Sequence, residues 1–119
     1  MKLLSRWFRH GSMSPSWIEP SALATRLERD DAPLILDVRG PDEFTGLLGH
    51  IREATNVPLI ELSAHLHDLV RENRSVVVVC KTDRRSSMVA QQLQDAGLSD
   101  VAILRGGMER WRVLGLPAN

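Results

Sequence analysis

The chain has 119 residues, of which 43% are hydrophobic and 25% charged, and its formal net charge at pH 7 is +0. These values are typical of one globular domain with a single core. The balanced charge argues against a nucleic-acid-binding protein, which usually carries a basic excess. No run of about 18 apolar residues exists that would predict a membrane span.

The chain contains one cysteine. A single cysteine excludes an internal disulfide and a metal site built from cysteines alone. It favours a reducing, cytoplasmic location, and the sequence predicts neither a metal ion nor an organic cofactor.

The first residues are basic and partly apolar. We expect residues 1–14 to be a flexible lead-in to one domain formed by residues 15–119. The alternative is a short amphipathic helix within residues 2–9, with an apolar face and a basic face, that contacts a membrane surface or a partner protein. So short a helix is only marginally stable alone.

From residue 16 onward, short apolar runs alternate with helical patterns. Runs bounded by proline or glycine predict extended segments, within 16–18, 32–39, 54–59, 75–79 and 100–107. Helical spacing predicts helices, within 20–28, from 59 onward, 86–96 and 107–115, with a turn or single helical turn at 40–46. The apolar faces expected to point inward contain Leu23, Ala24 and Leu27; Leu62, Leu66, Leu69 and Val70; Val89, Leu93 and Ala96; Met108, Trp111 and Leu114. This alternation predicts an α/β fold, a small and mostly parallel sheet flanked by helices on both faces.

Cys80 stands at the carboxyl end of "SVVVV", where α/β proteins place their ligands. Lys81, Arg84 and Arg85 follow it and outweigh Asp83 by two positive charges. We expect a helix to begin near Ser86. A helix start and nearby cations favour the thiolate, which is the nucleophilic form of cysteine. The segment therefore suits an anionic sulfur, or an anionic substrate delivered to it.

Four motifs in order resemble the rhodanese-like sulfurtransferases. They are "LILDVRGPDEF" with "GHI", "ATNVP", "VVVVCKTDRRS" and "LRGGMERWRVLGLP", and the match runs from about Trp17 to Pro117. The resemblance implies the rhodanese fold and a Cys80 that becomes a persulfide. It implies an active loop formed by Cys80, Lys81, Thr82, Asp83, Arg84 and Arg85. The donor would be a small anion such as thiosulfate, with sulfite released. The acceptor would be cyanide, a thiol, or a protein.

Several positions depart from the family pattern. Asp83 stands where many members have glycine, and Arg52-Glu53 replaces a usual Pro-Gly. The "FTGLLGHI" segment is longer than the commonest spacing. The resemblance also implies that Asp37 and Arg39 belong to the framework near the site. We expect Arg39 to pair with Glu43, and His50 to hold the framework rather than act as a general base.

Two other classes of protein remain open. A cysteine in a cationic strand-to-helix loop also suits a phosphatase or arsenate reductase. Related phosphatases, however, have Cys, five residues, then Arg, whereas position six after Cys80 is Ser86 and Arg85 comes one position early. The other class is a persulfide carrier or a rhodanese-like interaction module with little turnover of its own.

Overall fold

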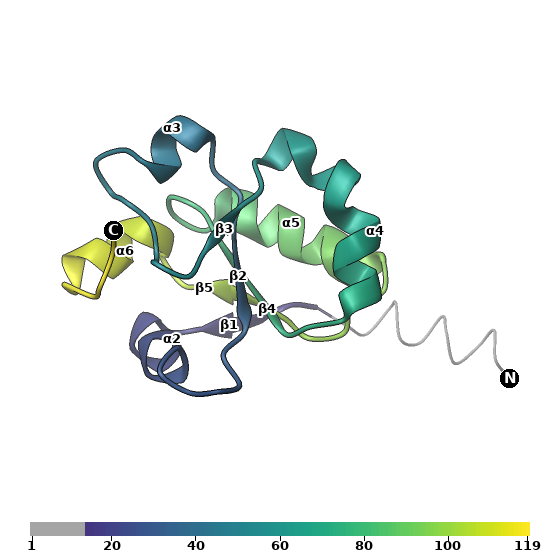
Figure 1. The fold of residues 1–119 in the computed structure, drawn as a ribbon, viewed down its shortest axis with the longest axis horizontal. Helices are drawn as coiled ribbons and strands as arrows, with labels where there is room; N and C mark the ends of the chain where they lie inside the picture. Colours follow the sequence, from purple (N-terminus) through teal and green to yellow (C-terminus); the bar gives the residue numbers. More distant parts are fainter. Residues whose placement is uncertain (1–13) are drawn as a thin grey trace, which may run out of the picture.

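The computed structural model describes residues 14–119, in which a parallel sheet lies between two layers of helices (Figure 1). The predictions for the N-terminal lead-in concern residues that, apart from Ser14, lie outside this range. The strands are β1 (Ser16–Ile18), β2 (Leu34–Asp37), β3 (Thr55–Asn56), β4 (Val76–Val79) and β5 (Val101–Leu104). The helices are α2 (Pro20–Arg26), α3 (Pro41–Phe44), η1 (Leu59–Glu61), α4 (Leu62–Glu72), α5 (Arg84–Asp95) and α6 (Gly107–Val113).

The five strands form one sheet in the order β1-β5-β4-β2-β3, and every neighbouring pair is parallel. β4 lies in the middle, and its four valines are all buried. A strand covered on both faces needs apolar side chains in both directions, which explains the unbroken run. The predicted α/β class with a parallel sheet is therefore confirmed, and the segment at 16–18 joins the sheet as an edge strand.

Alternation along β4 divides the core into two layers. Val76, Val78 and Cys80 point to one face, where they pack with residues of α4 and α5. Val77 and Val79 point to the other face, toward α2 and α6. The predicted helical cover on both faces is confirmed, and Cys80 belongs to the layer that contains α5.

Three predictions about helices differ from the structure. α5 begins at Arg84, two residues before the expected start. Ala96 is exposed, and Leu114 is 50% exposed, so neither points inward as expected. Each follows the last residue of its helix, where the chain leaves the face that the earlier turns bury. None of the helices in residues 14–119 is long and apolar enough to cross a bilayer.

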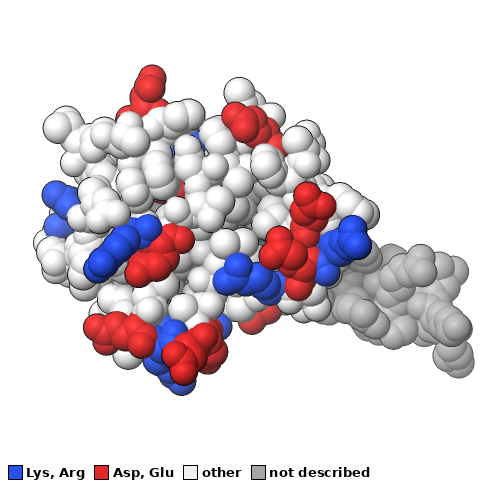
Figure 2. Space-filling model, in the orientation of Figure 1, with Lys and Arg blue, Asp and Glu red and all other residues white. Residues whose placement is uncertain are grey.

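Charged side chains of both signs lie next to one another in the lower half of the face seen in Figure 2. The described part of this face has no broad patch of a single charge.

Candidate active site

The carboxyl ends of β2, β4 and β5 meet at one edge of the sheet, because all three strands are parallel. β2 continues into Arg39 and α3, and β4 continues through Cys80 into α5. β5 continues through Gly106 into α6. Three segments that are distant in sequence are thus brought together around the one cysteine.

The Cys80 side chain is buried, with 1% of the residue exposed. Within residues 14–119 its sulfur has two polar contacts, and both come from Ser86. The Sγ atom lies 3.3 Å from the Ser86 Oγ and 3.4 Å from the Ser86 backbone nitrogen. Because the first amides of a helix have no partner within it, the sulfur serves as an acceptor for the start of α5.

The backbone of the loop is fastened from the other side by α6. The amide of Met108 donates to the Cys80 carbonyl at 2.9 Å, and the amide of Glu109 donates to the Lys81 carbonyl at 3.0 Å. Gly107 has a φ of +59°, and a Cβ there would lie 2.1 to 2.6 Å from the carbonyl oxygens of the loop residues 80–82. Only glycine allows this approach, so "GG" before the last helix does more than form a turn.

The three cations of the loop have different surroundings. The Lys81 Nζ lies 3.8 Å from the Glu109 carboxylate, at the surface. Arg85 donates to both oxygens of Glu43. Arg84 is exposed and forms no ion pair within residues 14–119.

This arrangement corrects the charge count made from the loop alone. Glu43 and Glu109 join Asp83, so three carboxylates surround three cations, and the expected excess of two positive charges is cancelled. The ion pair between Arg85 and Glu43 also changes the pKa of both residues. Hydrogen bonds from Arg85 lower the pKa of Glu43 from 4.5 to about 2, although burial opposes this change. The same hydrogen bonds raise the pKa of Arg85 above its ordinary value.

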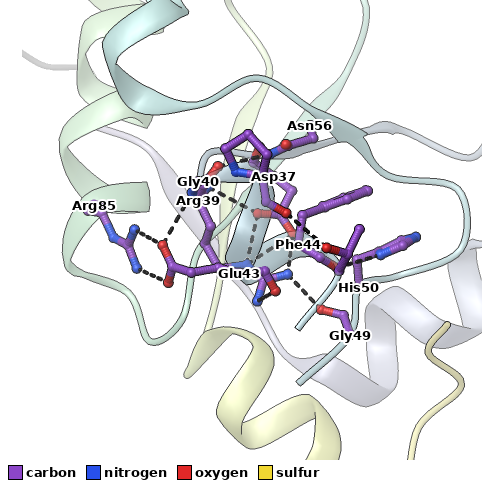
Figure 3. A network of polar contacts seen from close by, with 11 residues as sticks. Asp37, Arg39, Gly40, Glu43, Phe44, Gly49, His50, Asn56 and Arg85 are labelled. Atoms are coloured by element: carbon purple, nitrogen blue, oxygen red, sulfur yellow. Dashed lines mark hydrogen bonds and ion pairs between the residues drawn. The ribbon is translucent and has the colours of Figure 1, made fainter. Parts of the chain in front are cut away.

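Asp37 and Arg39 form a buried ion pair beside the loop (Figure 3). The Arg39 Nε and Nη2 atoms donate to the two Asp37 carboxylate oxygens at 3.0 and 2.8 Å. Arg39 also donates to the backbone carbonyls of Glu43 and Gly49. The prediction that Arg39 pairs with the Glu43 carboxylate is therefore wrong. Its guanidinium instead joins the end of β2 to the loop that follows α3.

His50 stacks on Phe44, with ring centroids 3.7 Å apart. Its Nδ1 lies 2.7 Å from the Phe44 carbonyl oxygen, so this nitrogen carries the proton and donates. Asn56 donates from Nδ2 to the carbonyls of Asp37 and Arg39. These contacts hold the segment between β2 and β3 against the end of β2.

Asp83 has a φ of −148°, so this position does not use the positive φ that favours glycine, and aspartate can stand where many family members have glycine. Its carboxylate forms no ion pair in the described part of the chain. Thr82 is half-buried, and its carbonyl lies against Gly107. Asp83 therefore forms no ion pair with Arg84 or Arg85.

Sequence reasoning missed three residues at this site: Ser86, Glu43 as the partner of Arg85, and Gly107 as the contact for the loop. Ser86 had a detectable signal. A serine in the first turn of a helix, six residues after the cysteine, lies within reach of the sulfur. The partner of Arg85 is 42 residues away, and nothing in the local sequence indicates it.

Comparison with known proteins agrees with this architecture. A family model described as the rhodanese-like domain matches residues 19–113, and the chain belongs to this family. The rhodanese-like domain of the Anabaena sp. Alr3790 protein, solved by solution NMR, superposes with a TM-score of 0.77 at 30% identity. The match covers 90% of this chain and 80% of that one.

Three relatives extend the comparison. The protein slr1261 of Synechocystis sp. is 36% identical over 84% of this chain, which spans 54% of that protein. A sulfurtransferase of Allochromatium vinosum is 30% identical, over 84% of this chain and 91% of the relative. The thiosulfate sulfurtransferase GlpE of Pseudomonas syringae is 33% identical, over 71% of this chain and 76% of the relative. The family is thus one in which sulfur transfer is a named activity.

Proposed function

We propose that this protein is a sulfurtransferase that moves a sulfane sulfur through a persulfide on Cys80. The donor is thiosulfate or another persulfide, and the acceptor is cyanide, a small thiol or a protein thiol. The observation that carries the proposal is the position of Cys80. It is the chain's one thiol, it follows the central strand, and the first turn of α5 contacts its sulfur.

The chemistry proceeds in two transfers. The Cys80 thiolate attacks the outer sulfur of thiosulfate, the S–S bond of thiosulfate breaks, and sulfite leaves with the bonding electron pair. The acceptor then attacks the outer sulfur of the persulfide, and the electron pair of that S–S bond returns to Cys80. Each transfer is a thiolate exchange of the kind that proceeds fastest with a stabilised leaving group.

Different residues have different proposed roles in this reaction. Arg84 and Lys81 are exposed cations that attract and orient a dianion. Arg85 is held by Glu43 and, with Thr82 and Asp83, shapes the loop. Asp37, Arg39 and His50 form the supporting framework, because their hydrogen bonds fix the neighbouring backbone rather than the sulfur. A free thiol suits a reducing compartment, so we place this reaction in the cytoplasm, carried out by residues 15–119 as one domain.

A phosphatase function is less well supported by the geometry. A phosphate-binding loop needs an arginine whose guanidinium can contact the substrate oxygens. Here both donating nitrogens of Arg85 contact Glu43, at 2.7 and 2.9 Å. A persulfide carrier with slow turnover shares the same Cys80 chemistry and differs only in its rate of discharge.

The deciding experiment is intact mass measurement after incubation with thiosulfate. We expect a gain of one sulfur atom, its removal by cyanide with formation of thiocyanate, and no gain in Cys80→Ser. A gain without discharge to cyanide or thiols would support the carrier function. No gain, together with hydrolysis of a phosphate ester, would contradict the proposal and support a phosphatase.

A further inference from the structure

Ser86 contacts the reacting sulfur with two of its own groups. We propose that Ser86 is a second catalytic residue, whose hydroxyl and amide stabilise the Cys80 thiolate in both transfers. This inference rests on the proposed function for its substrates. The geometric evidence for it is independent of that function, because Ser86 contacts the Cys80 sulfur without any substrate.

The Ser86 hydroxyl is buried and has one hydrogen-bond partner among the described residues. The residue is fully buried, with 0% exposed, in the first turn of α5. Within residues 14–119, the Cys80 sulfur is the hydrogen-bond partner of its Oγ, at 3.3 Å. A buried hydroxyl is costly unless it is hydrogen-bonded, so this contact satisfies the serine as well as the sulfur.

A hydroxyl can reverse the direction of its hydrogen bond, because it both donates and accepts. While Cys80 is a thiol, its S–H donates to the Ser86 Oγ. When the thiol proton has left to solvent, the hydroxyl turns and donates to the negative sulfur. The Ser86 amide lies 3.4 Å from the sulfur and supplies a second donor. Hydrogen bonds to a charged acceptor are stronger than those between neutral groups.

The same thiolate appears twice in the reaction. In the first transfer it is the nucleophile, formed before the S–S bond of thiosulfate breaks. In the second transfer it is the leaving group, released when the acceptor takes the outer sulfur. A donor at the Cys80 sulfur therefore favours both transfers, but with different dependence on pH. It increases the fraction of nucleophile at neutral pH, and it makes Cys80 a better leaving group at every pH.

The adjacent serine provides a matched control. Ser87 donates its hydroxyl to the Asp83 carbonyl, and the structure gives it no contact with the sulfur. Ser86→Ala and Ser87→Ala thus each remove one hydroxyl from the same turn of α5. Ser86→Thr keeps a hydroxyl at the critical position and tests whether the hydroxyl itself is responsible.

The experiment measures three rates in the full chain across a range of pH. These are alkylation of Cys80 by iodoacetamide, release of sulfite from thiosulfate, and discharge of the purified persulfide to cyanide. For Ser86→Ala we expect alkylation and sulfite release about tenfold slower at pH 7, near the lower limit for losing a hydrogen bond to a charged group. Both rates should approach those of the wild type near pH 10, where a thiol ionises without help.

Discharge should behave differently. It should be about tenfold slower than in the wild type at every pH, because the leaving group is impaired whatever the pH. Ser86→Thr should restore most of each rate, and Ser87→Ala should match the wild type.

Two results would overturn the proposal. One is that all three rates in Ser86→Ala equal those of the wild type. The other is that Ser86→Ala slows all three reactions by the same factor at every pH and that Ser86→Thr is equally slow. If the wild type gains no sulfur from thiosulfate, the proposed function fails instead. The alkylation profile then still decides the role of Ser86.

Discussion

Arg85 and Glu43 are 42 residues apart and form a two-bond ion pair, with Nη1 2.7 Å from Oε1 and Nη2 2.9 Å from Oε2. The pair joins the first turn of α5 to α3 (Figure 3). Glu43 also accepts from the Gly40 amide at the start of α3. One carboxylate thus fixes both the beginning of α3 and the last side chain of the active loop.

We predict that Glu43→Gln lowers stability near neutral pH and that the loss shrinks as the pH falls toward 2. The pKa of Glu43 is lowered from 4.5 to about 2, so its stabilising contribution is complete above 4.5. It is lost as the pH falls from 4.5 toward 2. The pair is about one-third exposed, which limits the effect to about 1 kcal/mol.

Urea unfolding of the wild type and of Glu43→Gln, at pH 7 and at pH 2.5, measures the difference in their free energies of unfolding. The exposed Glu53 forms no ion pair in the described part of the chain, so Glu53→Gln serves as the control. An equal gap between Glu43→Gln and the wild type at both pH values would show that the ion pair is not the cause.

Gly107→Ala should damage the fold and the site together. The new Cβ would overlap the carbonyl oxygens of the loop, at a φ of +59°. We expect a loss of at least about 3 kcal/mol in the free energy of unfolding, with reduced persulfide formation. Gly115→Ala is the matched control, since its φ is +69° but nothing lies within 4 Å of the new Cβ. That variant should lose about 1 kcal/mol and no activity. Equal losses would mean that backbone strain alone, rather than contact with the loop, explains the effect.

Asp83→Asn should accelerate persulfide formation from thiosulfate about two- to threefold. It removes a negative charge that opposes the dianion and leaves the backbone unchanged. Asp83→Gly should not increase the rate further. The φ at this position is −148°, so glycine is not required there, and a glycine would lose more conformational freedom on folding. The measurement is the rate of sulfite release. A slower Asp83→Asn would mean that the carboxylate orders the loop.

Arg84→Ala should weaken the use of thiosulfate more than Lys81→Ala. Arg84 has no ion pair within residues 14–119, whereas Lys81 lies 3.8 Å from Glu109. We expect kcat/KM for thiosulfate to fall about fivefold in Arg84→Ala, with a weaker dependence on ionic strength. Glu109→Gln should raise the same constant slightly. Identical losses in the two alanine variants would show that Glu109 does not screen Lys81.

The sequence predicts most of the strands and the position of the thiol because these depend on local patterns. Four consecutive valines specify a strand buried on both faces, and Cys80 follows directly from that strand. Helix faces were predicted correctly in their middle turns and wrongly at their ends. Leu114 keeps the apolar spacing of α6 but follows its last residue, so the face that buries Met108 and Trp111 no longer includes it.

The partners of charged residues were the least predictable feature. Arg39 was expected to pair with Glu43, four residues away, but the fully buried Asp37 is the stronger partner at two residues. Glu43 pairs instead with a residue on another helix. Where several parallel strands end at one edge, the topology brings charges from distant segments as close as sequence neighbours, so spacing along the chain alone does not identify the partner.

The order of the strands has a consequence for synthesis on the ribosome. β5 lies between β1 and β4, so Ser16 is paired with Ala102. β1 therefore cannot join the sheet until β5 has been synthesised. The loop that carries Cys80 also depends on a later segment, because the amides of Met108 and Glu109 donate to its carbonyls. The Cys80 thiol, which is made late in elongation, therefore stays outside a finished site until α6 has been synthesised and has packed against the loop.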